Sequence, residues 1–599
     1  MNPAPAVSLS PALPHSHTRR LSRSLVYIPP HHLSEQEGLT SSESATDTSW
    51  ESATEESASN RPTTLDESRL LPVLRGTHYP PPRYMHTQVP ARMDHDLTLD
   101  DEFDALRINV RDVTKYPAKQ HARKVVKQLG VRDGLIYLPG QPERLLEDSD
   151  QPQLFRQRRY FFYLSGANFE DCVVTYEIAP DKLTLWIPYV EPRQILWFGS
   201  KPSACECLRR YDVDQVRYTT QLSKFLKAYA ASPKSSPTVY ILHPDQAPDL
   251  GNGGDMTKSH MLHLDHALLK PAMDRSRLIK TDHEVALIRR ANDISSAAHR
   301  RVAENMLRLS NERQIEAIIQ AVCIANGARS QAYPIIAGSG RNASTLHYTA
   351  NNAPLEGKQS VVIDAGCEWE CYASDITRTL PLSGSFTPRA GAIHAIVQRM
   401  QDECIREVRP GKLWREIHLL AASIGLDGLL NLGILKGHRD EIARAGTVAA
   451  FFPHGLGHHV GLDVHDVSST LPLAVAQAGL QLDYGKRTMV TPAMYVEMMQ
   501  EQSQGVLLGP QERKRQHLET NMVVTVEPGI YFCREYLEGY FRMDPTHCRF
   551  IDWDILEGYY EVGGVRIEDC ILVTEDGHEN LTAAPKGDEL LDVINKGRR

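Results

Sequence analysis

The sequence predicts a protein of the α/β (α+β) class, with two domains behind a tail that does not fold by itself. Its 599 residues leave room for two or three domains at roughly 100–200 residues each. Helical and strand-like segments alternate from about Leu99 to about Met273, which is typical of an α/β domain. A long amphipathic helix then begins a second unit near Arg277, and this unit runs to the end of the sequence.

Composition excludes several classes of protein. The 66 Lys and Arg residues against 75 Asp and Glu give a formal net charge of −9, so the basic footprint of a nucleic-acid-binding protein is missing. No apolar run reaches the roughly 18 residues of a membrane span, and the first residues lack the features of a secretory signal. The ten cysteines form no CxxC pair. We therefore expect a reduced, cytoplasmic protein that binds neither nucleic acid nor membrane.

Residues 1–98 have the composition of a disordered tail. The stretch from Ser41 to Asn60 is mostly Ser, Thr, Glu and Ala, and a polyproline piece follows at Tyr79–Pro82. Such a sequence buries too little apolar surface to offset the entropy of the chain. The basic patch Arg19–Arg23 hints at organelle targeting, but the acidic tract behind it argues against a transit peptide.

Residues 99–277 are expected to form the first globular domain. Ala118 to Gly130 has the pattern of a helix that ends at its glycine. The runs Tyr160–Leu164 and Leu183–Pro188 are rich in aromatic and aliphatic residues, and they predict strands.

Residues 278–599 form the second predicted domain, and its first element is a long helix. Thr281 and Glu284 have the spacing of a capping box, in which the side chains of both residues satisfy free backbone N–H groups. Apolar residues then recur at spacings of three and four, as on one face of a helix. These residues are Leu287, Ala291, Ile294, Ala298, Val302 and Met306.

Two aspartates follow the first apolar strand of this domain. Val361–Ile363 is a short apolar run that ends in Asp364, and Asp375 comes eleven residues later, beyond a stretch with turn potential. If the segment is a hairpin, the two carboxylates face each other across neighbouring strands. The alternative is that both are ordinary turn and edge residues.

Two further strands carry charged side chains. Val523–Val526 ends in Glu527, and a carboxylate buried there needs a cation or a hydrogen-bonding partner. Arg566 and Glu568 alternate with apolar residues, so they should share one face of a strand. The alternative for this pair is a simple ion pair on a sheet.

A glycine-rich, histidine-rich segment runs from His454 to Asp466. Its His-x-x-x-His spacing resembles that of zinc proteases, but Gly455 replaces the glutamate they require, and the glycines argue against a helix. Four carboxylates and one histidine would instead form an oxygen-rich site for two divalent ions. The hardness of these ligands favours Mn²⁺, with Zn²⁺ or Co²⁺ as alternatives.

Together these segments resemble the proline-specific metallopeptidases of the pita-bread fold, above all fungal Xaa-Pro aminopeptidases (aminopeptidase P) and the related prolidases. The matching motifs occur in the family's order. They are Ile363–Gly366, Ser374–Thr379, His454–Asp466, Thr525–Gly529 and Gly564–Asp569. The resemblance extends from about Tyr116–Ala122 to near the C-terminus. It implies a creatinase-like α/β domain at 99–277 and a pita-bread catalytic domain at 278–599.

The resemblance also assigns roles to residues. It implies that two metal ions are held by five ligands, of which Asp375 and Glu568 touch both ions. These ligands are Asp364, Asp375, His458, Glu527 and Glu568. His347 and His465 would lie around the substrate, and His454 and Arg566 would shape the same pocket. Glu527 would also take part in proton transfer with the attacking hydroxide.

The sequence departs from the family between His458 and Glu527. Ser468 and Ser469 stand where the family has glycine, and residues 473–516 form an unusual insertion. Its methionines are Met489, Met494, Met498 and Met499. A surface insertion, a substrate lid and an error in the gene model all remain open for this segment.

The resemblance implies hydrolysis of proline-containing peptides. The expected activity is release of the residue before a penultimate proline, through a hydroxide that bridges two metal ions. A prolidase that cleaves only Xaa-Pro dipeptides is the alternative, and a non-catalytic binding module with the same fold is a remote one. The resemblance further implies a homodimer.

Overall fold

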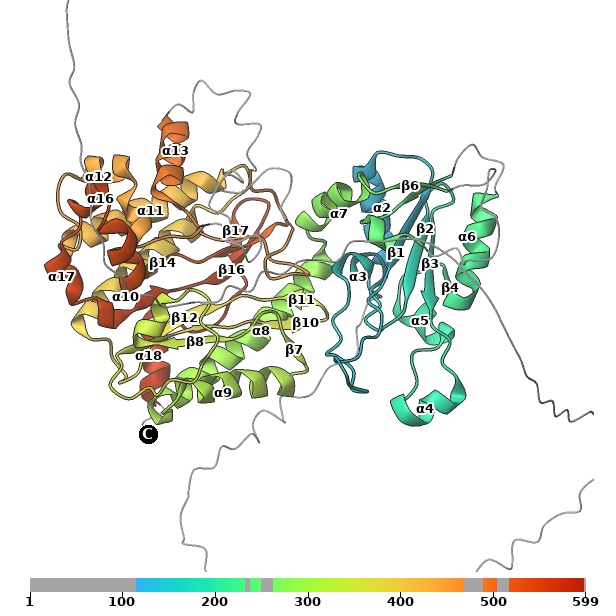
Figure 1. Cartoon of the computed structure of the whole chain (residues 1–599), viewed down its shortest axis with the longest axis horizontal. Coiled ribbons are helices and arrows are strands. Elements are labelled where there is room, and N and C mark those ends of the chain that lie inside the picture. Colours follow the sequence, from blue (N-terminus) through green and yellow to red (C-terminus); the bar gives the residue numbers. More distant parts are fainter. Residues whose placement is uncertain (1–114, 232–236, 249–261, 468–488, 504–516, 597–599) are drawn as a thin grey trace, which may run out of the picture. The chain divides into compact units, whose positions relative to one another are not determined.

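The computed structural model describes residues 115–231, 237–248, 262–467, 489–503 and 517–596 (Figure 1). The predicted tail at 1–98 and most of the predicted insertion at 473–516 lie outside these ranges. The chain splits into the units Met1–Asp94 and His95–Arg599, and all described elements belong to the second. Within the described ranges, no helix has both the length and the apolar character needed to cross a bilayer.

A mixed six-stranded sheet is the centre of the N-terminal domain. Its strand order is β4-β3-β2-β1-β5-β6, with antiparallel pairs β1–β2 and β2–β3 and parallel pairs elsewhere. The strands are β1 (Leu135–Pro139), β2 (Val173–Glu177), β3 (Lys182–Ile187), β4 (Gln215–Tyr218), β5 (Thr238–Tyr240) and β6 (His263–Asp265). The helices are α2 (Ala118–Leu129), α3 (Arg159–Ser165), α4 (Pro192–Phe198), α5 (Ala204–Arg210), α6 (Leu222–Ala230) and α7 (Leu269–Leu278).

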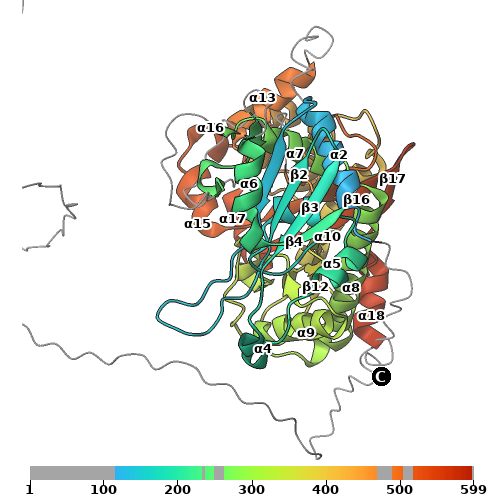
Figure 2. The same ribbon diagram turned by 90° about the vertical axis from the view of Figure 1, so that its right-hand side faces the viewer.

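The two faces of this sheet pack against different helices. Ile136 and Leu138 point to a core shared with α2 and α3, whereas Leu135 and Tyr137 point to a second core shared with α6. Figure 2 shows α2 and α6 on opposite sides of β2, β3 and β4. This period-two alternation is what a sheet covered on both faces requires.

Two sequence predictions for this domain are confirmed and one is wrong. Helix α2 ends before Gly130, which adopts φ +71°, and strand β3 lies at the predicted position. The predicted strand at Tyr160–Leu164 is helix α3, which Gly166 ends at φ +68°. Phe161 to Leu164 are all buried, and periodicity does not separate a short buried helix from a buried strand.

The described residues of the C-terminal domain form four small sheets. They have the orders β11-β10-β7, β12-β9-β8, β13-β16-β17 and β14-β15. The strands of the first half are β7 (Ser330–Gln331), β8 (Ile336–Ser339), β9 (Ser360–Asp364), β10 (Cys367–Trp369), β11 (Tyr372–Ala373) and β12 (Thr377–Pro381). Those of the second half are β13 (Val523–Val526), β14 (Gly529–Tyr531), β15 (Gly564–Arg566), β16 (Asp569–Val573) and β17 (His578–Asn580).

Separate groups of helices support the two halves. Helices α8, α9 and α18 share a core with β8, β9 and β12, whereas α10 to α13 share another with β13 to β16. The longer helices are α8 (Asp282–Asn305), α9 (Glu312–Ala325), α10 (Pro388–Arg406), α11 (Trp414–Asn431), α12 (Arg439–Ala445), α13 (Pro492–Ser503) and α18 (Gly587–Lys596). Short helices are α15 (Arg534–Tyr536), α16 (Pro545–Cys548) and α17 (Trp553–Glu557).

Helix α8 confirms the predicted capping box and apolar face. The Thr281 side chain accepts a hydrogen bond from the N–H of Glu284, and the Glu284 side chain accepts one from the N–H of Thr281. Five of the six predicted apolar residues belong to the core with α9. They are Ala291, Ile294, Ala298, Val302 and Met306.

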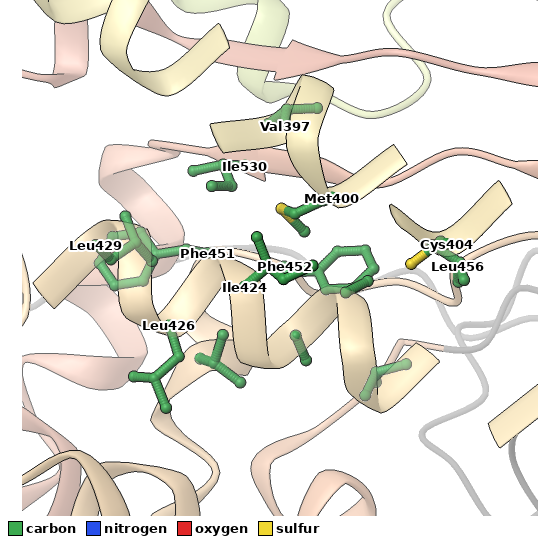
Figure 3. Packing of buried hydrophobic residues seen from close by; sticks show 14 of the residues in the cluster. Val397, Met400, Cys404, Ile424, Leu426, Leu429, Phe451, Phe452, Leu456 and Ile530 are labelled. Atoms are coloured by element: carbon green, nitrogen blue, oxygen red, sulfur yellow. The ribbon is translucent and has the colours of Figure 1, made fainter. Parts of the chain in front are cut away.

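The largest core anchors the segment that leads to His454. Figure 3 shows Val397 and Met400 of α10 and Ile424 of α11 close to Phe451 and Phe452. Leu456 and Ile530 lie in the same cluster. The segment that carries the predicted histidines is therefore fixed by apolar packing on both sides of His454.

The described part of the insertion is a core helix. Helix α13 packs against α11 and α12, its Tyr495 and Met498 belong to the main core, and its Met494 is also buried. Just before it, the backbone N–H of Val490 donates to the carbonyl of Pro453 at 2.8 Å. The Met-rich helix thus packs as internal structure next to the active-site segment.

Candidate metal centre

The predicted hairpin brings Asp364 and Asp375 together. Strand β9 pairs antiparallel with β12, with Asp364 opposite Thr377, and Asp375 lies just before β12. The Tyr333 hydroxyl is 2.7 Å from Asp364 Oδ1 and 2.6 Å from Asp375 Oδ1. The two carboxylates are therefore neighbours, as the hairpin interpretation predicts.

The segment from His454 to Asp466 is not helical, as predicted, and its first part runs beside strand β13. The N–H of Thr525 donates to the carbonyl of His458 at 2.9 Å, and the N–H of Glu527 donates to that of Leu456 at 2.8 Å. This pairing places His458 Nε2 at 3.3 Å from Glu527 Oε1 and 3.4 Å from Asp375 Oδ2. His458 thus connects a ligand candidate from each half of the domain.

Gly457 permits this close pairing. A Cβ atom at this position would lie 2.0 Å from the backbone oxygen of Thr525, so any side chain would push the His458 loop away from β13. The glycine is required by contact with a neighbouring backbone and not by a positive φ.

The expectation that Arg566 and Glu568 share one strand face is wrong. Strand β15 ends at Arg566 and pairs with β14, whereas β16 begins at Asp569 and pairs with β13. The chain changes sheets between them, and Glu568 instead forms an isolated bridge with Thr377.

The side chains of Arg566 and Glu568 nevertheless reach the same centre. Arg566 Nη2 donates to Asp364 Oδ2 at 2.5 Å, and Thr377 Oγ1 donates to Glu568 Oε2 at 2.7 Å. Each has a partner on the opposite half, so the alternative of a simple Arg566–Glu568 ion pair is also wrong.

The centre holds more negative charge than its own cations balance. Burial, together with the other carboxylates, raises the pKa of Asp375 to about 6 and that of Glu568 well above its usual range. Burial acts in the same direction on Glu527, but His458 outweighs it and lowers the pKa of Glu527 to about 2. The same two carboxylates, Asp375 and Glu527, raise the pKa of His458 against the effect of its burial.

The residues of this centre fit a divalent cation. Asp375, His458 and Glu568 each offer one ligand atom, and these atoms lie within 4.8 Å of one another. Glu568 Oε1 is buried and has no hydrogen-bond partner in the described part of the chain, which is costly unless a cation fills that place. Carboxylate oxygens with one imidazole suit a borderline or hard divalent metal.

Three further histidines surround the centre. His454 Nε2 lies 2.9 Å from the Tyr531 hydroxyl, and the His465 ring packs edge-on against His458 with centroids 4.3 Å apart. The charge on His458, followed by burial, lowers the pKa of His465 to about 4. His347 is exposed, and its charge acts on both His454 and His465.

Sequence reasoning missed the hydroxyl groups that orient these side chains. Tyr531 accepts a hydrogen bond from Arg566 Nη1 at 2.9 Å, and Thr525 Oγ1 donates to Glu527 Oε1 at 3.2 Å. Thr377 and Thr525 lie inside the recognised motifs and Tyr531 lies two residues beyond one, so inspection of motif neighbours could have found them. Tyr333 has no local signal and depends on the tertiary fold.

Comparison with known proteins identifies the family. Residues 286–575 match the model for metallopeptidase family M24, and residues 118–240 match the N-terminal domain of aminopeptidase P. A probable Xaa-Pro aminopeptidase of Metarhizium acridum is 73% identical over 514 residues, which are 85% of this chain and 100% of the relative. One from Colletotrichum graminicola is 56% identical over 527 residues, covering 84% of this chain and 99% of the relative.

Solved structures agree with these matches. A zinc-substituted E. coli aminopeptidase P in complex with product has a TM-score of 0.64 and 27% sequence identity, covering 81% of this chain and all of that one. The predicted α/β class, the pita-bread domain and the metallopeptidase class are thereby confirmed. The chain belongs to metallopeptidase family M24, in the group that carries the aminopeptidase P N-terminal domain.

Proposed function

We propose that this chain is an Xaa-Pro aminopeptidase, which releases the N-terminal residue from peptides with proline in the second position. The fungal relatives bear this name, and both match the chain along nearly their whole length. The observation that carries the proposal is the convergence of four carboxylates and His458 between the two halves of the catalytic domain. A non-catalytic module has no use for such a charged, buried centre.

The proposed resident metals are two Mn²⁺ ions, with Zn²⁺ or Co²⁺ as substitutes. Their ligands would be Asp364, Asp375, His458, Glu527 and Glu568. When bound, such ions lower the pKa of water and polarise the carbonyl of the scissile bond.

The side chains around the ligands have distinct proposed roles. The neighbouring His458 lowers the pKa of Glu527 and so keeps its carboxylate ionised, and we assign to this carboxylate the proton of the attacking water. His465 has a pKa of about 4 and is neutral there, so its ring N–H can donate to the carbonyl oxygen as negative charge develops. Arg566 holds Asp364 in place and, through Tyr531, connects to His454.

Recognition of proline must use shape rather than hydrogen bonding. The amide nitrogen of a prolyl peptide bond carries no N–H and is enclosed in a ring. Groups on either side of that bond must therefore orient the peptide, and we assign part of this role to His347, which is exposed.

The test is product analysis with two peptides. The purified protein with Mn²⁺ is incubated with an Xaa-Pro dipeptide and an Xaa-Pro-Xaa tripeptide, and the products are identified by mass spectrometry. Release of the first residue from the tripeptide supports the proposal, whereas cleavage confined to the dipeptide would identify a prolidase. Full activity after complete removal of metal would refute the mechanism, and Glu527→Gln should bind the tripeptide without cleaving it.

We further propose a homodimer. Helix α4 supports it, because Leu196, Trp197 and Phe198 are 84%, 78% and 79% exposed and the helix has no buried residue. Contiguous apolar side chains of this size mark an interaction surface. Light scattering after size-exclusion chromatography should give the mass of two chains, and the double variant Leu196→Ser, Trp197→Ser should give the mass of one.

A further inference from the structure

A buried ion cluster joins helix α7 and the residues after it to the active-site loop. Arg277 lies in α7, Lys280 follows this helix, and Asp466 is the last residue of the histidine-rich segment. The side chains of all three are 1% exposed. Neither family model covers Arg277 or Lys280, because the two matches end at 240 and begin at 286.

Each oxygen of Asp466 has its own cation. Arg277 Nη2 donates to Oδ1 at 2.7 Å, and Lys280 Nζ donates to Oδ2 at 3.1 Å. Arg277 Nη2 also contacts Asp463 Oδ2 at 3.0 Å, so the arginine connects two acidic residues of the loop. Burial would raise the pKa of Asp466, but Lys280 and Arg277 outweigh it and lower this pKa.

Backbone hydrogen bonds within the loop fold it around the carboxylate of Asp466. The backbone N–H of Asp466 donates to the carbonyl of His459 at 2.9 Å, and that of Gly461 donates to the carbonyl of Asp463 at 3.1 Å. A Cβ atom on Gly461 would lie 2.2 Å from Asp466 Oδ2, so the carboxylate packs directly on the glycine backbone. The turn from His459 to Asp466 is therefore built around this carboxylate.

His465 precedes Asp466 and receives its position from this turn. Its ring meets the His458 ring at an interplanar angle of 86°, although the residue itself is exposed. The next residue along the chain, Asp466, is held by two buried cations. Movement of the Asp466 carboxylate would move the backbone of His465 with it.

We propose that Arg277 and Lys280 are positioning residues for His465, acting through the carboxylate of Asp466. The segment between the two matched domains then completes the active site without touching the substrate. The inference rests on the role of His465 in the proposed function.

The test compares variants of the metal-loaded full-length protein. Lys280→Gln removes one of the two cations and leaves the Arg277–Asp466 contact, whereas Asp466→Asn removes the charge that both cations hold. Loss of a residue that orients a group of the active site typically lowers activity about tenfold to a hundredfold, so we expect kcat to fall by this factor while KM changes little. Arg275→Gln is the matched control, because Arg275 lies on the same helix and pairs with Glu519 outside the loop.

A double-mutant cycle separates positioning from general destabilisation. In the His465→Ala background, Lys280→Gln should have almost no further effect on kcat, because the residue it positions is gone. An equal fold-loss in both backgrounds, or an unchanged kcat in Lys280→Gln, would overturn the inference. A fully active His465→Ala variant would remove the role of His465 and the inference with it.

A second measurement does not depend on activity. Hydrogen exchange of the backbone amides from His459 to Asp466 should become faster in Lys280→Gln and stay unchanged in Arg275→Gln. Unchanged protection in both variants would overturn the inference even if no peptide were cleaved. A protein that cleaves neither peptide yet shows the faster exchange would instead refute the proposed function and leave the structural link intact.

Discussion

The buried carboxylate of Glu284 should make the free energy of unfolding depend on pH. A single substitution at Glu284 should remove this contribution. Glu284 is 1% exposed and accepts hydrogen bonds from the N–H of Thr281 at 2.8 Å and from the Tyr372 hydroxyl at 3.1 Å. His121 Nε2 of the N-terminal domain lies 3.5 Å away. Burial opposes ionisation, but His121, Lys124 and the Thr281 N–H outweigh it and lower the pKa of Glu284 from 4.5 to about 2.

The size of the effect follows from this shift. At 1.36 kcal/mol per pKa unit, the ionised Glu284 contributes about 3 kcal/mol to the free energy of unfolding. Because the folded pKa is depressed, the contribution is complete above pH 4.5 and is lost as the pH falls towards 2. Linkage places the loss at roughly 1 kcal/mol by pH 3.5.

The assay is urea unfolding of the wild type and of Glu284→Gln at pH 7 and at pH 3.5. The difference in unfolding free energy should be about 3 kcal/mol at pH 7 and roughly 1 kcal/mol smaller at pH 3.5. The control is Glu206→Gln, which changes an exposed capping box with Ser203 and should have a much smaller effect. A difference for Glu284→Gln that is the same at both pH values would refute the reasoning, because the charge would then not be its source.

Three further predictions concern the metal centre. Gly457→Ala should lower the free energy of unfolding by about 1–3 kcal/mol through overpacking against the Thr525 backbone, and weaken Mn²⁺ binding measured by calorimetry. Tyr333→Phe removes the hydroxyl that contacts Asp364 and Asp375, so it should weaken Mn²⁺ binding about tenfold to a hundredfold. Adding Mn²⁺ to metal-free protein should raise the unfolding temperature. At a free metal concentration of 100 times Kd, the free energy of unfolding should increase by about 3 kcal/mol.

Each of these predictions has a control and a contradictory outcome. Gly539→Ala places the same methyl group where no atom lies within 4 Å, so it should leave metal binding unchanged. Equal effects of both glycine variants would show that contact with β13 is not the cause. Tyr348→Phe is the control for Tyr333, because its hydroxyl contacts Glu312 away from the metal centre. An unfolding temperature that does not respond to Mn²⁺ would contradict the assignment of a metal to the buried carboxylates.

Local patterns predicted the strands that carry the ligands. Strand β9 contains the apolar run before Asp364, and β13 coincides with the apolar run before Glu527. Burial of both faces makes such strands continuous apolar runs, which is why they are visible in a single sequence. The motif order then gave the candidate ligands, and the structure brings all five to one centre.

What the sequence did not predict depends on tertiary contacts. The chain changes sheets between Arg566 and Glu568 because β15 and β16 pair with different strands. No property of residues 564–569 alone indicates this change of sheet. Helix α3 reads as a strand in the sequence because Phe161 to Leu164 form a continuous apolar run that is buried in the structure. The roles of Tyr333 and Tyr531 and the Arg277–Asp466 contact join residues far apart in the chain, beyond the reach of local periodicity.

The distribution of ligands along the chain also determines when this protein can become a peptidase. Asp364 and Asp375 come from the first half of the catalytic domain, and Glu527 and Glu568 come from the second. Contacts between such distant residues pay the largest loop-closure entropy and therefore form late in folding. A nascent chain still on the ribosome, with Glu568 not yet synthesised, holds no complete centre. The order of synthesis thus delays assembly of the centre until residue 568 has been made and the whole domain has closed.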